Sequence, residues 1–272
     1  MTTAALAQRS SHPRVPGRLR RLYLRRERLI LGITGMAGIL ITWEIASRLG
    51  ILNRIIYSSP SAVFGALARE LAKGAIYEHL WVSIAEYFAG YGLAIVIGVT
   101  LGFLAGWSRI ANYVLDPWIT VLYSAPVVAL VPIIILAFGI DLASKAVIVF
   151  FICVFSIIVN TMVGVQQTGK TFLDVSKTFG ASQRMQITSV VLPGSVPYIL
   201  TGLRLAGGQA TVGVVVGELV AGNEGIGFLL DRAGANLQSS LVMGIILLLG
   251  LWGIGLGEVL RRLELRFESW RG

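Results

Sequence analysis

The chain has 272 residues, of which 55% are hydrophobic and 14% charged, and its formal net charge is +9. A typical soluble domain carries roughly 25% charged residues, and a soluble chain this apolar would expose large hydrophobic patches. The composition therefore excludes an ordinary soluble enzyme or binding module, and it predicts a single domain embedded in lipid.

The first 28 residues form a basic tail that abuts a long apolar stretch. Eight of these residues are arginines. Because basic segments beside a span are retained in the cytoplasm, we expect the tail, residues 1–28, on the inner side of the membrane. A nucleic-acid-binding arm would also be basic, but no domain of interleaved aromatic and basic residues follows this tail.

Six apolar stretches qualify, or nearly qualify, as membrane spans, since a helix needs about 20 apolar residues to cross the hydrocarbon. Continuous apolar runs of this length predict helices, whose backbone groups are satisfied within the segment. Basic residues in the loops place both termini in the cytoplasm. We therefore predict an all-α integral membrane protein, a six-transmembrane-helix bundle, with spans at 29–49, 80–106, 118–139, 144–165, 195–220 and 239–260.

The segments between these spans complete the expected organisation. Residues 50–76 form an outer-face segment that contains a short amphipathic helix, opened by Pro60 and Ser61. Residues 77–262 form the core with five of the spans, and residues 263–272 form a cytoplasmic tail. The apolar face of the amphipathic helix would combine Val63, Phe64, Leu67 and Leu71.

Glycine is frequent inside the second and fifth spans. Small residues let helices approach closely in lipid, where packing drives association. The sequence therefore predicts a compact bundle, through Gly90, Gly92, Gly98, Gly102, Gly202, Gly207, Gly208, Gly213 and Gly217.

The cytoplasmic segment between the fourth and fifth spans, residues 166–193, carries a spaced pattern. Asp174-Val175-Ser176 precedes Gly180, and Val190 and Leu192-Pro193 follow it. This spacing resembles the EAA loop, E-A-A-x3-G-x9-I-x-L-P, through which ABC-importer permeases dock on a separate ATPase. The first three positions depart from the pattern, although the acid is kept. The resemblance assigns coupling to Asp174, Val175, Ser176, Lys177, Phe179, Gly180, Ala181, Arg184, Leu192 and Pro193.

Physical chemistry gives this segment an expected structure that does not depend on the family. A short coupling helix would run from about Phe172 to Gly180, with Asp174 near its N-terminus to complement the helix dipole. Gly180 would adopt positive φ and end the helix. Pro193 would lie at the start of the fifth span, where no internal hydrogen bond is lost. The alternative is a plain polar loop between two spans.

The resemblance extends over about residues 75–265. Shorter matching segments are Ser124-Ala125-Pro126, Phe138-Gly139-Ile140, Asn160-Thr161, Thr201-Gly202-Leu203-Arg204, Glu218-Leu219 and Gly225-Ile226-Gly227-Phe228. With them, the chain is similar to the nitrate, taurine and alkanesulfonate branch of the binding-protein-dependent transport inner-membrane components, which have the type I importer fold.

This resemblance implies a permease subunit of a prokaryotic inner (plasma) membrane rather than an enzyme. The implied partners are two copies of an ABC ATPase, a second permease copy in a homodimer, and a periplasmic or lipid-anchored substrate-binding protein. ATP and Mg²⁺ would be bound by the ATPase, with no cofactor in this chain. The implied substrate is a small oxyanion such as a sulfonate, taurine, nitrate or bicarbonate.

Two other transport functions stay open. A permease of the same branch could carry a different small solute, such as an aromatic acid or a vitamin precursor. A secondary transporter would work without an ATPase, and the segment 166–193 would then have no coupling role. Nucleotide binding by this chain is not expected, because its G-x4-G-K-T match at residues 164–171 follows an apolar run too long for a strand.

Polar and kink-forming residues inside the spans are the candidates for the translocation pathway. Ionisable groups in spans are expensive and tend to be functional. This rule selects Glu44, Glu86 and Glu218, with Glu218 as the candidate for the outer gate or a pathway contact. Arg204 would be either a lipid-headgroup anchor or a pathway residue near the inner end. Glu86 stands where this branch more usually has a basic residue, which weakens an anion-lined pore. The remaining candidates, each with helix packing as the alternative, are Ser124, Pro126, Asn160 and Gln209.

Overall fold

The computed structural model describes residues 18–53, 57–168 and 170–268, and most of them are helical. The chain divides into two compact units, residues 1–54 and 55–272. The first unit contains α1 (Arg18–Arg48), which begins well before the span predicted at 29, so the end of the basic tail is helical. The rest of that tail, residues 1–17, and the last four residues of the predicted C-terminal tail lie outside the described residues.

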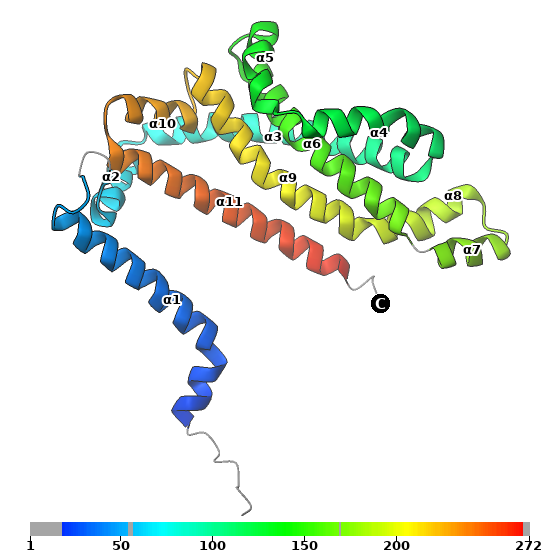
Figure 1. Ribbon diagram of the computed structural model, residues 1–272, viewed down its shortest axis with the longest axis horizontal. Coiled ribbons are helices and arrows are strands. Elements are labelled where there is room, and N and C mark those ends of the chain that lie inside the picture. The colour runs from blue at the N-terminus through cyan, green and yellow to red at the C-terminus, as the bar shows by residue number, and fades with distance from the viewer. Residues whose placement is uncertain (1–17, 54–56, 169, 269–272) are drawn as a thin grey trace, which may run out of the picture. The chain divides into compact units, whose positions relative to one another are not determined.

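The second unit is a bundle of long helices (Figure 1). Helix α3 packs on α6, α6 on α9, and α9 on α11. Five helices of the described chain, α1 included, are long and apolar enough to cross a membrane, and six if the bent pair of α4 and α5 is one span. The helices of this unit are α2 (Pro60–Lys73), α3 (Ala75–Trp107), α4 (Arg109–Ser124), α5 (Val131–Phe138), α6 (Leu142–Gln167), α7 (Lys170–Thr178), α8 (Gln183–Gln186), α9 (Leu192–Ala221), α10 (Ile226–Ala235) and α11 (Ser239–Glu268).

The third predicted span, 118–139, is wrong as a continuous helix. Helix α4 ends at Ser124, and its axis meets the following helical segment, Val127–Phe138, at 86°. The break falls at Ala125, whose ψ of 139° is extended. A residue before proline avoids the α region, and Pro126 has no N–H to continue the helix, so this dipeptide interrupts an otherwise apolar run.

A ladder of small residues on α3 sets its close approach to α6. The ladder repeats every fourth residue, the spacing of one helix face. A Cβ at Gly98 would lie 2.9 Å from Cβ of Ile157, so no side chain fits there. Gly92 points away from this ladder and faces open space. The ladder therefore confirms close packing through glycine, and its members are Gly90, Ala94, Gly98, Gly102 and Gly106.

The short helix predicted after the first span is present as α2. Ser59 caps it by accepting a hydrogen bond from Ala62 N (3.3 Å), and Gly74 ends it at φ 85°. Its apolar face packs on protein, because Leu67 joins a buried cluster with residues of α3, α10 and α11. Phe64 was wrongly placed on that face and is 54% exposed.

Candidate functional site

The N-terminus of α10 is held by side chains from two other helices. Gly225 N–H donates to Nδ1 of His79 (3.1 Å), and Ile226 N–H donates to Oγ of Ser83 (2.9 Å). Gly227 N–H donates to Oε2 of Glu218 (2.5 Å). The first N–H groups of a helix lack internal partners, and Gly225 has no side chain to cap them. We call His79, Ser83, Glu218 and these three N–H groups the α10 anchor.

Glu218 is the centre of the α10 anchor. It is 1% exposed, and its Oε1 accepts a hydrogen bond from Ser83 Oγ (2.5 Å). The helix dipole of α10 favours a negative charge at this position. The glycines beside it leave room for its carboxyl group, since a Cβ at Gly225 or Gly227 would overlap Glu218. Gly225 also has φ 107°, which L-residues with a Cβ rarely adopt.

A second buried acid lies next to the anchor. Glu86 of α3 is 1% exposed, and its Oε1 pairs with Nζ of Lys145 on α6 at 2.9 Å. Both residues line a polar cavity of about 380 Å³ together with Asp141, Asn223 and Glu224. We call this end of the unit, where α3 begins and α9 ends, the outer end, following the orientation predicted from the basic segments. Two predicted pathway residues, Glu86 and Glu218, thus lie at the same end of the unit. We call Glu86, Lys145 and the α10 anchor together the outer cluster.

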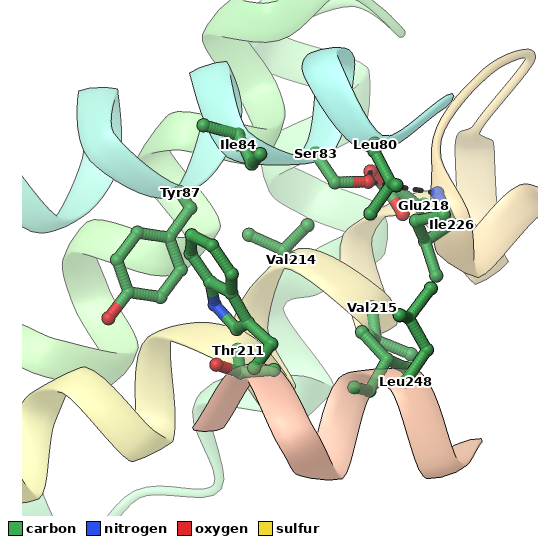
Figure 2. Close-up of a pocket in the computed structure, with 12 residues that line it drawn as sticks. Leu80, Ser83, Ile84, Tyr87, Thr211, Val214, Val215, Glu218, Ile226 and Leu248 are labelled. Carbon is green, nitrogen blue, oxygen red and sulfur yellow. Dashed lines mark hydrogen bonds between the residues drawn. The ribbon is translucent and has the colours of Figure 1, made fainter. Parts of the chain in front are cut away.

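A small cavity borders the α10 anchor inside the bundle (Figure 2). Ser83 and Glu218 lie at one end of it, and Tyr87 and Thr211 at the other. Its volume is about 40 Å³, and a cavity needs about 10–15 Å³ on the same measure to hold one water. This cavity is therefore too small for a transported solute, and Glu218 here stabilises helix packing.

Two other predicted residues meet halfway along the bundle. Ser156 Oγ on α6 donates to Oε1 of Gln209 on α9 (2.7 Å), and Asn160 Nδ2 donates to the carbonyl of Ser156 (2.8 Å). Gln209 is exposed, whereas Ser156 is buried. We call Ser156, Asn160 and Gln209 the α6–α9 polar cluster.

The remaining predicted pathway residues are not part of either cluster. Ser124 and Pro126 are exposed at the break between α4 and α5, where Ser124 Oγ donates to the carbonyl of Thr120 (2.8 Å). Arg204 pairs with Glu264 of α11 at 3.0 Å. Thr201 Oγ1 donates to the same carboxylate (3.1 Å), so Arg204 joins α9 to α11.

Four contributing residues were missed from sequence: His79, Ser83, Lys145 and Ser156. Serines and histidines inside apolar helices are usually ordinary packing residues, and their partners lie on other helices more than 50 residues away. Of these four residues only Lys145 stands out in the sequence, because it is a charged residue at the start of an apolar run, close to Asp141.

The predicted coupling helix is present as α7, and its end matches the expectation. Gly180 has φ 73°. Its N–H donates to the carbonyl of Lys177 (2.9 Å), and Ala181 N–H donates to that of Ser176 (3.0 Å). These two bonds form a Schellman motif, the common way to end a helix with glycine.

Two details of the coupling segment differ from the prediction. Helix α7 begins at Lys170, so Asp174 lies in its middle and pairs with Lys177 at 3.4 Å rather than serving the N-terminus. Pro193 lies in the first turn of α9, as predicted. A helix nevertheless already precedes it, because the helical stretch runs from Gln183, which Ser182 caps, through a π turn at Ile187–Val191. In a π turn the regular α-helical hydrogen bonds are interrupted. Pro193 contributes to this interruption, because it has no N–H with which to make such a bond.

Apolar side chains of the coupling segment face outward. Phe172, Val175 and Phe179 are 70%, 48% and 86% exposed. Their spacing places the first two on one side of α7 and the third, which directly follows the helix, in line with them. We call these three residues the α7 stripe. Figure 1 shows α7 and α8 beyond the ends of α6 and α9, near the end of α11. The charged residues of the segment, Asp174, Lys177 and Arg184, are exposed as well.

These features define the chain as a multi-pass membrane transport subunit with a helical extension at its inner end. The chain belongs to the family of binding-protein-dependent transport system inner membrane components, which matches residues 94–268. It is thus a non-catalytic ABC-importer permease of the inner membrane, and ATP hydrolysis falls to a partner ATPase.

The similarity of this chain to three other permeases supports this membership. The permease SsuC of Escherichia coli (strain K12), whose name assigns it to aliphatic sulfonate transport, is 34% identical over 79% of this chain and 82% of its own length. SsuC of Bacillus subtilis (strain 168) is 29% identical over 88% and 87%. The formylaminopyrimidine transport permease ThiX of Halalkalibacterium halodurans is 30% identical over 86% and 92%.

The fold also matches a solved transporter. A chain in the crystal structure of an amino acid ABC transporter with histidines aligns with a TM-score of 0.59, covering 75% of this chain and 97% of its own. The sequence identity is only 14%, so this likeness concerns the fold alone. It agrees with the predicted type I permease fold.

Proposed function

We propose that this permease couples to its ATPase through α7 and α8, with the α7 stripe as the docking contact. The observation that carries the proposal is the exposure of three apolar side chains, two on one side of α7 and one between α7 and Gly180. Exposure of apolar surface to water is unfavourable by about 25 cal/mol per Å², and this cost is removed when a partner covers the surface. The EAA-type spacing around Gly180 supports the same assignment.

The coupling has a physical requirement. ATP drives alternation between inward-open and outward-open shapes only if the ATPase binds the two shapes with different affinity, and about 5.5 kcal/mol swings the populations from 1:99 to 99:1. Helix α8 continues through the π turn into α9 without a break. A displacement of α8 by the ATPase would therefore be transmitted directly to α9.

We infer a pathway lined by the α6–α9 polar cluster, with Glu218 acting on the outer gate by holding α10. Hydroxyl and amide groups bind oxyanions by donating hydrogen bonds, so the cluster suits a small oxyanion. The names of the two SsuC relatives favour a sulfonate, and taurine, nitrate and bicarbonate belong to the same class. The name of ThiX supports the alternative of a vitamin precursor. A second permease copy and a binding protein would complete the importer.

Replacement of Phe179 by Ser tests the docking contact. In the full importer reconstituted in liposomes, we expect Phe179→Ser to weaken ATPase binding at least tenfold and to abolish ATP-driven uptake, as for a buried aromatic hot spot. Phe64→Ser, an exposed phenylalanine at the outer end, is the matched control and should leave both unchanged. Unaltered ATPase affinity in Phe179→Ser would refute the proposed contact, and uptake by the chain alone without ATP would favour a secondary transporter.

A further inference from the structure

The outer cluster contains one oxygen that its surroundings leave unsatisfied. Glu86 Oε1 pairs with Lys145, but Glu86 Oε2 is buried and has no hydrogen-bond partner among the described residues. Glu86 lies one helical turn after Ser83 on α3, and Ser83 Oγ donates to Oε1 of Glu218 (2.5 Å), so the two carboxyl groups are neighbours. Ionised carboxylates only accept hydrogen bonds, so two of them in contact cannot satisfy each other.

The charges of the cluster do not balance either. Glu86 and Glu218 would carry two negative charges when ionised, and Lys145 supplies one positive charge. An uncompensated buried charge is strongly destabilising. The other ionisable groups that line the neighbouring cavity, Asp141 and Glu224, are also acids. His79 offers no compensation, because its Nδ1 accepts a hydrogen bond from Gly225.

One proton would remove both deficits. A protonated carboxyl group donates a hydrogen bond, which gives Glu86 Oε2 a partner and leaves the cluster neutral. The polar cavity of about 380 Å³ that Glu86 and Lys145 line at the outer end offers a route for this proton. We propose that Glu86 and Glu218 form a proton-binding site that holds one shared proton, and that this proton keeps the α10 anchor closed.

Loss of the shared proton loosens the α10 anchor. Loss of the proton at alkaline pH leaves two carboxylates in contact, and their repulsion moves Glu218 away from Ser83 and from Gly227 N–H. The start of α10 then loses its bond to α9, and Ser83, which accepts from Ile226 N–H, loses the carboxylate that holds its own hydroxyl group. The anchor is thus closed below the pH at which the proton leaves and loosened above it. This site involves neither α7 nor the ATPase, so it stands independently of the proposed coupling.

Infrared spectroscopy of the full-length chain in lipid tests the proton directly. At neutral pH we expect a carboxylic-acid carbonyl band in the wild type. Glu86→Gln should lose it, because the introduced amide is uncharged and Lys145 then balances ionised Glu218. Glu218→Gln should lose it for the same reason, with Glu86 then balanced by Lys145. Glu264→Gln, which alters an acid already paired with Arg204, is the control and should keep the band.

A second measurement covers the case in which a variant folds poorly. We expect the melting temperature of the wild type to fall as pH rises from neutral to alkaline, and that of Glu86→Gln to lose this dependence, since its amide donates to Glu218 without a proton. Absence of the band from the wild type would overturn the proposal. Equal pH dependence in both proteins, or a full band in Glu86→Gln, would overturn it as well.

Discussion

The outer cluster and the α7 stripe differ in what they leave exposed. At the outer end, polar side chains are buried and bonded to one another, as Glu218 is to Ser83 and to Gly227 N–H. In the α7 stripe, apolar side chains are exposed, with Phe179 86% exposed. Folding of the single chain buries and pairs the polar groups of the first region, whereas the second region is stabilised only when another molecule covers it.

This difference separates stability from assembly. Substitutions in the outer cluster should lower the free energy of unfolding, because they leave buried polar groups without partners. Substitutions in the α7 stripe should leave that free energy nearly unchanged and weaken only the contact with the ATPase. The comparison breaks down if the two regions respond alike.

The largest expected loss of stability comes from Lys145→Met. Removing one partner of a buried ion pair typically costs about 3–5 kcal/mol, because the other charge is left uncompensated. Equilibrium unfolding in mixed micelles at neutral pH measures the loss, and it should shrink at acid pH, where the carboxyl groups of Glu86 and Glu218 are both protonated and no charge is left to balance. A variant as stable as the wild type would show that the pair is not buried as described.

The same substitution at two glycines compares the regions directly. Gly225→Ala places a Cβ on the Glu218 carboxyl group at a backbone φ of 107°, so we expect a loss of about 2–4 kcal/mol from strain and overpacking together. Gly180→Ala has the same left-handed strain at φ 73° but meets open space, so about 1 kcal/mol is expected there. Both are measured by unfolding in mixed micelles. Equal losses would mean that the contact with Glu218 contributes nothing.

The sequence predicted what local chemistry determines. Apolar length located the spans, and the spacing around Gly180 located the end of α7, because a left-handed glycine and its two hydrogen bonds involve only adjacent residues. Pro126 was a candidate for a kink, but the division of the span into two helices at 86° was missed, since mean hydropathy over a span does not register a single dipeptide. The continuation of the helix through Pro193 was missed for a similar reason, because a π turn has no simple residue pattern.

The α10 anchor was predictable only in part. Glu218 was selected as an ionisable residue in a span, which is the general signal for function. Its partner Ser83 lies 135 positions away in sequence, and Lys145 meets Glu86 from another helix. Pairings of this kind depend on how helices are rotated against one another, which the ladder of glycines on α3 constrains but does not reveal in sequence alone.

The smallest expected effect on stability is that of Phe172→Ala. Phe172 is 70% exposed, and alanine is the better helix former, so the free energy of unfolding should change by no more than about 0.5 kcal/mol. The affinity for the ATPase should nevertheless fall about tenfold, since truncating an interface aromatic commonly costs more than 1 kcal/mol. Unfolding in mixed micelles and binding of the purified ATPase to the permease in nanodiscs measure the two quantities on one preparation. A large loss of stability with unchanged affinity would place Phe172 in the fold of this chain and remove it from the docking surface.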